Sequence, residues 1–202
     1  MEKRHPALQD FLDSVHAVLG AETMVGAAAP SVTRIFEALQ EPRPARSGAG
    51  ARLPVCVHLD AALATAQTAS APLARVADAF ARLEPHLAWR RRPGGPTASE
   101  NFEDGHANAM LAGPGGFEER NDVWIGASLM APHVRYPDHT HKPEETYLVL
   151  SEGEFRQSDA PWFRPGIGGT LFNVPNIRHA MRSGDAPLFA VWCLWVDRAD
   201  AI

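Results

Sequence analysis

The stretch Tyr136 to Tyr147, YPDHTHKPEETY, gathers two histidines, two adjacent glutamates and both tyrosines of the chain. Packing alone rarely requires such a density of metal-binding and proton-transfer groups. Side chains two residues apart on an extended strand point to the same face of a sheet. If His139 and His141 lie on one strand, their imidazoles therefore share a face and can bind one metal ion.

A second strand is expected to follow these histidines. Pro143 cannot donate a hydrogen bond to a sheet, so the chain is expected to turn there. Glu145 and Tyr147 then share one face of the new strand, whereas Glu144 has the opposite parity and is expected on the surface. The two strands can bring four functional groups to one point.

His179 is the candidate for a fourth ligand, because it follows a glycine-rich turn at 166–169 and an expected strand at 169–174. Three histidines and one carboxylate suit Fe(II), Zn, Mn or Co, and the ligand set does not choose among them. The alternative is a polar hairpin without metal, since H-x-H is a short pattern. His106 and His133 are further candidates to line a pocket.

Length and composition favour one domain, or a compact domain with an extension. The chain has 202 residues, an apolar fraction of 45% and a net charge of −5. Without long runs of like charge, neither nucleic acid nor an anionic membrane surface is expected as a partner. The one basic cluster, Arg90 to Arg92, is interpreted as a solvated linker rather than a phosphate site.

The cellular location is predicted from what the sequence lacks. Its N-terminus does not have the basic and apolar pattern of a secretory leader, and no apolar run approaches the roughly 20 residues of a membrane helix. Cys193 lies in an apolar run and is expected to be a buried, reduced thiol. We therefore expect a cytoplasmic protein.

The spacing of apolar residues divides the chain into two regions. Three- and four-residue spacing predicts helices at 6–20, 31–40, 60–68 and 72–83, with Ser31 as a possible cap. Later, turn residues separate short runs that predict strands at 106–111, 123–130, 146–150, 169–174 and 188–196. The expected fold is mainly β, with an α-helical N-terminal extension over residues 1–88 and an antiparallel barrel over 89–202.

The last expected strand, 188–196, is apolar on both faces, so its outer face must be covered. One face would carry Trp192 and Leu194, and the other would carry Cys193 and Trp195. The N-terminal helices are the available cover, and they are also expected to form a lid over the mouth of the barrel.

At this point the residues resemble a known family. H-x-H-x-x-x-E at 139–145, followed by a turn and His179, is similar to the two-part motif of the cupin superfamily. With its flanking tyrosines, the stretch resembles cupin-type dimethylsulfoniopropionate (DMSP) lyases, most closely the DddQ type. The resemblance extends to the GHANA segment at 105–109 and to YLVLS at 147–151. Asn176 stands where many cupins have glycine, and asparagine tolerates the positive φ of such a turn.

The resemblance implies a cupin double-stranded β-helix, or jelly-roll barrel, that holds one divalent transition metal through His139, His141, Glu145 and His179. It also implies a carbon–sulfur lyase whose small-molecule substrate is a sulfonium carboxylate. Removal of the proton α to the carboxylate would release dimethyl sulfide and leave acrylate. The resemblance leaves a homodimer open.

The tyrosines and tryptophans receive roles within this implied reaction. Tyr147 is the first candidate for the base, because it would share a face with Glu145 close to a cation, and Tyr136 is the second. Aromatic faces suit a sulfonium cation. The candidates for this substrate-binding role are Trp162, Phe163, Trp192 and Trp195.

Two other functions remain open at the level of sequence. A lyase-like metal cupin could act on another small carboxylate by elimination, isomerisation or oxygenation. A non-catalytic cupin could hold a small ligand, although two tyrosines beside a full ligand set argue against that function.

Overall fold

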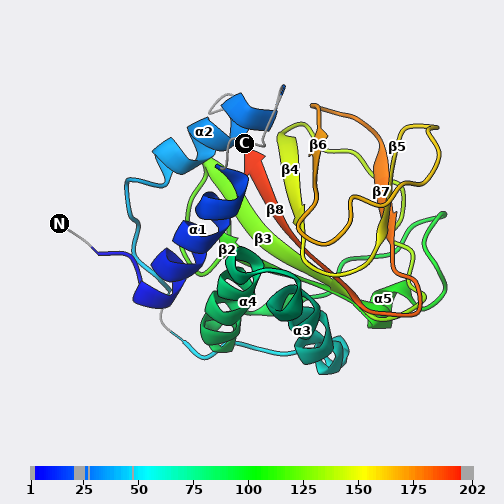
Figure 1. Cartoon of the computed structure of the whole chain (residues 1–202), viewed down its shortest axis with the longest axis horizontal. Coiled ribbons are helices and arrows are strands. Elements are labelled where there is room, and N and C mark those ends of the chain that lie inside the picture. Colours follow the sequence, from blue (N-terminus) through cyan, green and yellow to red (C-terminus); the bar gives the residue numbers. More distant parts are fainter. Residues whose placement is uncertain (1–2, 21–25, 27, 47, 197–202) are drawn as a thin grey trace.

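Amphipathic helices occupy the first part of the chain (Figure 1). This computed structural model describes residues 3–20, 26, 28–46 and 48–196. Its helices are α1 (Pro6–Leu19), α2 (Ala28–Ala38), α3 (Leu59–Ala69), α4 (Ala71–Leu83) and the short α5 (Phe102–Gly105), with 3-10 turns at Pro54–His58 and Glu84–His86. The predicted helices are confirmed, with one correction. Ser31 lies inside α2 and cannot cap it, because the helix begins at Ala28.

Antiparallel strands form two sheets in the second part of the chain. They are β1 (Trp89–Arg90), β2 (His106–Ala112), β3 (Val123–Met130), β4 (Glu144–Val149), β5 (Glu154–Gln157), β6 (Thr170–Asn173), β7 (His179–Arg182) and β8 (Leu188–Trp195). The large sheet has the order β1-β2-β3-β8-β4-β6, and β5 pairs with β7 in the small one. The five predicted strands are confirmed to within two residues at each end, whereas β1, β5 and β7 were not predicted.

The large sheet has two buried faces, which serve two different cores. On β8, Val191 and Cys193 belong to the cluster that includes the helices, and Trp195 packs against the same cluster. Trp192 and Leu194 belong to a second cluster on the other face, together with residues of β5, β6 and β7. The predicted division of this strand into two faces is confirmed. Cys193 is a buried free thiol, also as predicted.

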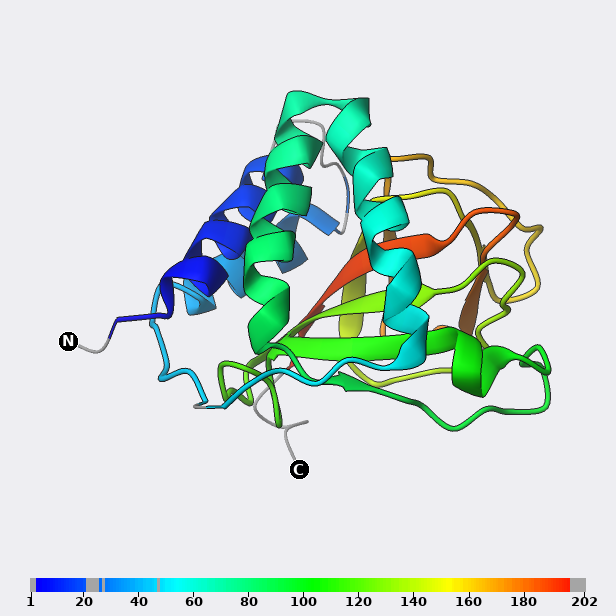
Figure 2. The same cartoon turned by 90° about the horizontal axis from the view of Figure 1, so that it is seen from below.

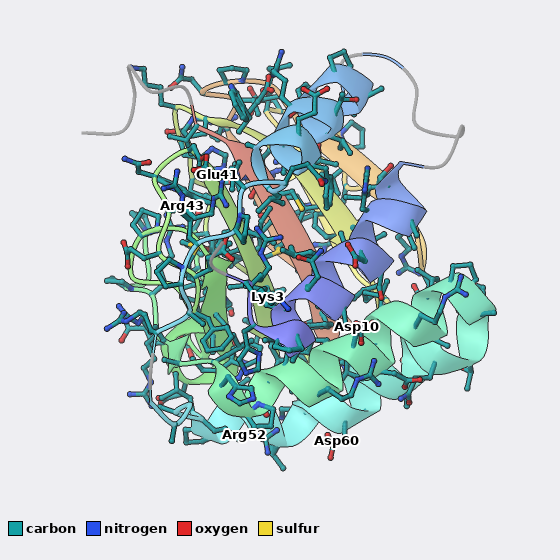
Figure 3. The ribbon with its side chains drawn as sticks, turned by 90° about the vertical axis from the view of Figure 1, so that its left-hand side faces the viewer. Lys3, Asp10, Glu41, Arg43, Arg52 and Asp60 are labelled. Atoms are coloured by element: carbon teal, nitrogen blue, oxygen red, sulfur yellow. The ribbon has the colours of Figure 1, made fainter. Side chains whose placement is uncertain are left out.

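Helices α1 to α4 cover the outer face of the large sheet. Figure 2 shows α3 and α4 side by side over the strands, and Figure 3 shows α1 and α2 beside them, with Asp10 and Asp60 on the outward surface. The predicted cover is therefore confirmed. The predicted lid over the mouth of the barrel stays a prediction, and the described residues that line the cavity begin at Arg92.

The element order confirms a mainly β fold with a helical N-terminal extension. The division at residue 88 stays a prediction, and β1 begins directly after it, at Trp89. Within the described part of the chain, every helix is too short or too polar to span a bilayer.

A buried ion cluster ties the start of the chain to the loop between β2 and β3. Arg4 Nε lies 2.6 Å from one oxygen of Glu118, and Arg120 Nη1 lies 2.9 Å from the other. Both guanidiniums also donate hydrogen bonds to carbonyl groups at the end of α2, those of Leu39 and Ala38. The cluster thus fixes the helical layer on the sheet.

Replacing Glu118 by glutamine is expected to lower the free energy of unfolding by about 3–5 kcal/mol, because it leaves buried Arg4 without its carboxylate partner and Arg120 with Asp122 alone. Urea denaturation followed by far-UV circular dichroism measures this change. Glu152→Gln at an exposed position is the control, with an expected change within about 0.5 kcal/mol. Equal stabilities of the two variants would contradict a structural role for the cluster.

Candidate metal centre and cavity

Backbone pairing brings His139 and His179 together. The peptide groups of these two residues exchange two hydrogen bonds of 3.0 Å, and the amide of Tyr136 donates to Met181 on β7. The predicted strand carrying His139 and His141 is an extended segment with isolated bridges. The turn before β7 also holds this segment, because the backbone N–H of Asn176 donates a hydrogen bond to the carbonyl of His141. Asn176 has a φ of 62°, so the predicted positive φ is confirmed.

The register of β4 places its functional side chains inside the barrel. β4 lies between β8 and β6, where Glu145 is opposite Leu194 on one side and Asn173 on the other. Tyr147, two residues later, is opposite Trp192. Glu144 points outward and pairs with Arg34 of α2. The predicted turn and the predicted parity of this strand are both confirmed.

Three imidazoles converge in this region. The ligand atoms of His139, His141 and His179 all lie within 4.8 Å of one another. Each ring places Nδ1 within 2.8–3.0 Å of a backbone carbonyl two residues away. A ring nitrogen that meets a carbonyl must carry the proton, so each neutral ring presents an unprotonated Nε2.

Glu145 completes the group with an almost fully buried carboxylate. Its Oε2 atom lies 3.2 Å from Nε2 of both His141 and His179. Burial favours the neutral acid, but the contacts with these two histidines outweigh it and hold the pKa of Glu145 well below its ordinary value. Asn173 Nδ2 donates to the same oxygen at 2.9 Å, and Gln157 in turn donates to Asn173.

The protonation of this group fits a bound cation. Burial lowers the pKa of His139 to about 3, so this ring is neutral at physiological pH. Burial also opposes the charged form of His141, but the hydrogen bond and charge of Glu145 raise its pKa above the ordinary value. His179 Nε2 is buried and makes no hydrogen bond. The nitrogen lone pairs and the negative carboxylate repel one another unless a cation lies between them. Three imidazoles and one carboxylate are ligands that suit a transition metal.

The two tyrosines have different surroundings, although both are buried. The hydroxyl oxygen of Tyr136 accepts a hydrogen bond of 2.7 Å from Arg92 Nη1. Burial raises the pKa of Tyr136, while the charge of Arg92 and the hydrogen bonds of Asn108 and Arg92 act against that rise. Burial raises the pKa of Tyr147 well above its usual range, and the charge and hydrogen bond of Glu145 add to the rise. Both phenols are therefore protonated at neutral pH, and among the described residues Arg92 donates a hydrogen bond to Tyr136 but not to Tyr147.

A cavity of about 210 Å³ joins the tyrosines to the imidazoles. This volume lies below the ~300–1,000 Å³ of pockets that take drug-sized ligands. The residues that line it are Arg92, Asn108, Met110, Trp124, Ser128, Tyr136, His139, Thr140, His141, Glu145, Tyr147, Trp192 and Leu194. The site can therefore hold a small molecule next to a metal ion.

Of the four aromatic residues predicted to bind substrate, Trp192 lines this cavity. Its ring lies against Gly126 of β3, where a Cβ atom would come within 2.1 Å of the indole, so only glycine leaves room for it. The indole nitrogen donates to Ser128 Oγ at 3.1 Å. Trp124, which the sequence did not single out, forms another part of the wall.

The other three predicted aromatics lie elsewhere. Trp162 faces the guanidiniums of Arg135, Arg156 and Arg182, at 4.4–5.6 Å from its ring centre. Phe163 is partly exposed and pairs through its backbone with β5. Trp195, on the outer face of β8, lies under Arg34.

His106 and His133, considered as pocket residues, do not line the cavity either. His106 is buried behind Tyr136, with 4.7 Å between ring centres, and burial lowers its pKa to about 3. His133 is exposed and lies 3.7 Å from Asp185.

Arg92 is a cavity residue that the sequence interpretation missed. It was assigned to a solvated linker, yet its side chain lines the cavity. Its position after a basic pair gave no signal, because the direction of a loop side chain depends on what the loop packs against. Asn108 was also missed, although it lies in the GHANA segment that had been noted.

Comparison with known proteins supports the sequence resemblance. Residues 27–190 match the sequence profile of the dimethylsulfoniopropionate lyase family. The chain is similar to dimethylsulfoniopropionate lyase DddQ of Ruegeria pomeroyi, with 32% identity over 123 residues, which make up 60% of this chain and 61% of that protein. The matched region thus spans about three fifths of this curated relative.

Solved structures match over a greater length. The crystal structure of the DMSP lyase DddQ from Ruegeria pomeroyi covers 96% of this chain and 93% of its own, with 28% identity and a TM-score of 0.73. A structure reported with the DMSP lyases RdDddP and RnDddQII covers 94% of this chain and 92% of its own, with 24% identity and a TM-score of 0.69. The predicted cupin barrel with its helical extension is confirmed as the fold class.

Replacing His179 by alanine is expected to weaken metal binding by more than the roughly 10–100-fold that loss of a residue supporting a ligand costs. Equilibrium dialysis against buffered Zn(II) or Mn(II), with metal content read by mass spectrometry, measures the affinity. His133→Ala removes an exposed histidine and serves as the control. An unchanged metal-to-protein ratio in His179→Ala would remove this residue from the centre.

Proposed function

The chain belongs to the dimethylsulfoniopropionate lyase family, and we propose that it cleaves DMSP into dimethyl sulfide and acrylate. The observation that carries the proposal is the cavity in which two tyrosines and a histidine–carboxylate group meet. A β-elimination needs a group that takes a proton from carbon and a means of stabilising the resulting charge. The tyrosines and the metal centre are suited to these two tasks.

His139, His141, Glu145 and His179 are the proposed ligands of one divalent ion, which could be Fe, Zn, Mn or Co. When bound, such an ion would act as a Lewis acid that polarises the carboxylate of the substrate and acidifies its α-hydrogen. Asn173 holds the carboxylate of Glu145 in place at 2.9 Å, and the backbone carbonyls fix the tautomers of the imidazoles.

Tyr136 is the proposed base, with Tyr147 as the group that orients the substrate. The sequence favoured the reverse order, but the surroundings of the two phenols support this one. A phenolate at Tyr136 would keep the hydrogen bond from Arg92 at 2.7 Å. Among the described residues, no arginine donates a hydrogen bond to the hydroxyl of Tyr147, so a phenolate there would lack this support.

The elimination has a simple balance of atoms. Tyr136 first loses its hydroxyl proton to water, and the resulting phenolate takes the proton from the carbon next to the carboxylate. The electron pair of that C–H bond forms the new C=C bond. The bond between the β-carbon and sulfur breaks, and its electron pair leaves with dimethyl sulfide. Acrylate and one proton remain. Trp192 and Trp124 offer aromatic faces to the sulfonium group, which has no hydrogen-bond donor.

Release of dimethyl sulfide tests the proposed activity. The purified chain is loaded separately with Fe(II), Mn(II), Co(II) or Zn(II) and supplied with DMSP, and the headspace is sampled by gas chromatography. We expect release with at least one metal and none after chelation, because three of the four proposed ligands line the same cavity as both tyrosines. Failure with all four metals, in protein shown to contain them, would falsify the lyase proposal.

Replacing each tyrosine by phenylalanine separates their proposed roles. Tyr136→Phe should lower turnover by about 10²–10⁴-fold, the usual contribution of a general base, and leave the metal content unchanged. Tyr147→Phe should raise KM more than it lowers kcat, because this residue positions the substrate. Initial rates over a range of DMSP concentrations measure both constants. A larger loss of kcat in Tyr147→Phe than in Tyr136→Phe would reverse the assignment.

A further inference from the structure

Arg92 reaches the cavity from the linker that follows β1. The short strand β1 pairs with β2, with Arg90 opposite Asn108, and this pairing directs the next residues toward the site. Arg92 Nη1 donates to the hydroxyl of Tyr136 at 2.7 Å, and the guanidinium carbon lies 5.3 Å from the centre of that ring. The side chain therefore has a fixed position at the wall of the cavity.

This guanidinium lacks the counter-charge that is usual for a half-buried arginine. Among the residues that the structure describes, Arg92 forms no ion pair with a carboxylate, whereas the adjacent Arg91 pairs with Asp104 at 2.6 Å. An arginine has five N–H donors, and the contact with Tyr136 uses one of them. The remaining donors can bind an anion that enters the cavity.

We propose that Arg92 binds the carboxylate of the substrate and thereby sets the direction in which the substrate lies. This inference rests on the proposed lyase function and adds a second anchor to the metal centre. A guanidinium matches a carboxylate in shape and charge, and it can hold both oxygens at once. It also repels a sulfonium group, so the cationic end of DMSP is directed elsewhere.

The rest of the cavity wall fits this orientation. Strands β2, β3 and β8 supply Met110, Trp124, Trp192 and Leu194, and all four are uncharged. The charge of Glu145 is already engaged with histidines, so it does not compete for Arg92. The carboxylate thus meets Arg92 beside Tyr136, and the sulfonium meets the aromatic wall. Tyr136 then lies next to the carbon that loses its proton.

Binding of propionate tests the anchor without any turnover, because propionate carries the carboxylate but no leaving group. Isothermal titration calorimetry measures its affinity for metal-loaded and chelator-treated protein, with propionamide as the neutral comparison. We expect Arg92→Gln to weaken propionate binding by about 10–100-fold, the value of a charged hydrogen-bond pair, and to leave propionamide binding unchanged. Arg92→Lys should restore part of the affinity, since it keeps the charge but loses the two-pronged geometry.

Arg91→Gln is the matched control. It removes the same charge one residue away, at a side chain that is exposed and paired with Asp104, and it should bind propionate as the unaltered chain does. Equal propionate affinities of Arg92→Gln and Arg91→Gln would overturn the inference.

The unaltered protein provides a test that needs no variant: after chelation it should bind propionate at least about 10-fold more tightly than propionamide. Equal binding of the two would also overturn the inference.

The outcome also distinguishes this inference from the lyase proposal. If propionate binding depends on Arg92 but no dimethyl sulfide is released, the anchor stands and the choice of substrate fails. If dimethyl sulfide is released but propionate binds Arg92→Gln normally, the lyase stands and the anchor fails. If the lyase proposal and the anchor are both correct, KM for DMSP should rise in Arg92→Gln by the same factor as the dissociation constant of propionate.

Discussion

The ionised carboxylate of Glu145 is the group on which the arrangement of the site depends. Removing a charge from water is costly unless partners compensate for it, and Glu145 is almost entirely buried. Its partners are two imidazoles and the amide of Asn173, each at about 3 Å. In their neutral form the same imidazoles donate through Nδ1 to the backbone, so Nε2 carries no proton. A divalent cation would resolve this conflict, because it would attract both the carboxylate and the nitrogen lone pairs.

The sheet keeps this costly group separate from the helices. Alternation along β8 sends Val191 and Cys193 toward the helical layer and Trp192 and Leu194 toward the cavity. The helices can therefore stabilise one face by apolar packing without touching the chemistry on the other. Gly126 shows how closely the inner face is fitted, since a single methyl group there would collide with the Trp192 indole. The stability of the fold and the composition of the site are thus set by residues of opposite parity.

Local patterns were sufficient for the longer helices and strands and for the proposed ligands at 139–145. Apolar residues at three- and four-residue spacing predicted the helices, and long apolar runs predicted β3 and β8. Such patterns are readable because they persist over many residues. The convergence of His139, His141 and Glu145 was predictable, because spacings of two and four residues place side chains on shared faces. The strands β1, β5 and β7 were missed because each has two to four residues and depends on pairing with distant segments. Trp162 was misplaced for a related reason: its affinity for cations was foreseen, but its partners are three arginines of its own chain.

The two tyrosines show where sequence reasoning must give way to structure. Both flank the same motif and both are buried, so sequence distance to Glu145 was the only guide to their roles. The difference between them comes from Arg92, more than forty positions away from Tyr136 along the chain. Arg92 reaches Tyr136 because β1 adds to the edge of the large sheet, and the Trp89 indole anchors β1 by donating to Glu84 at 2.9 Å. A strand of two residues, too short to be seen in any pattern, therefore decides which phenol lies beside a cation. Electrostatic roles in such a site follow from the path of the linker, and this path is set by packing between the helical extension and the barrel.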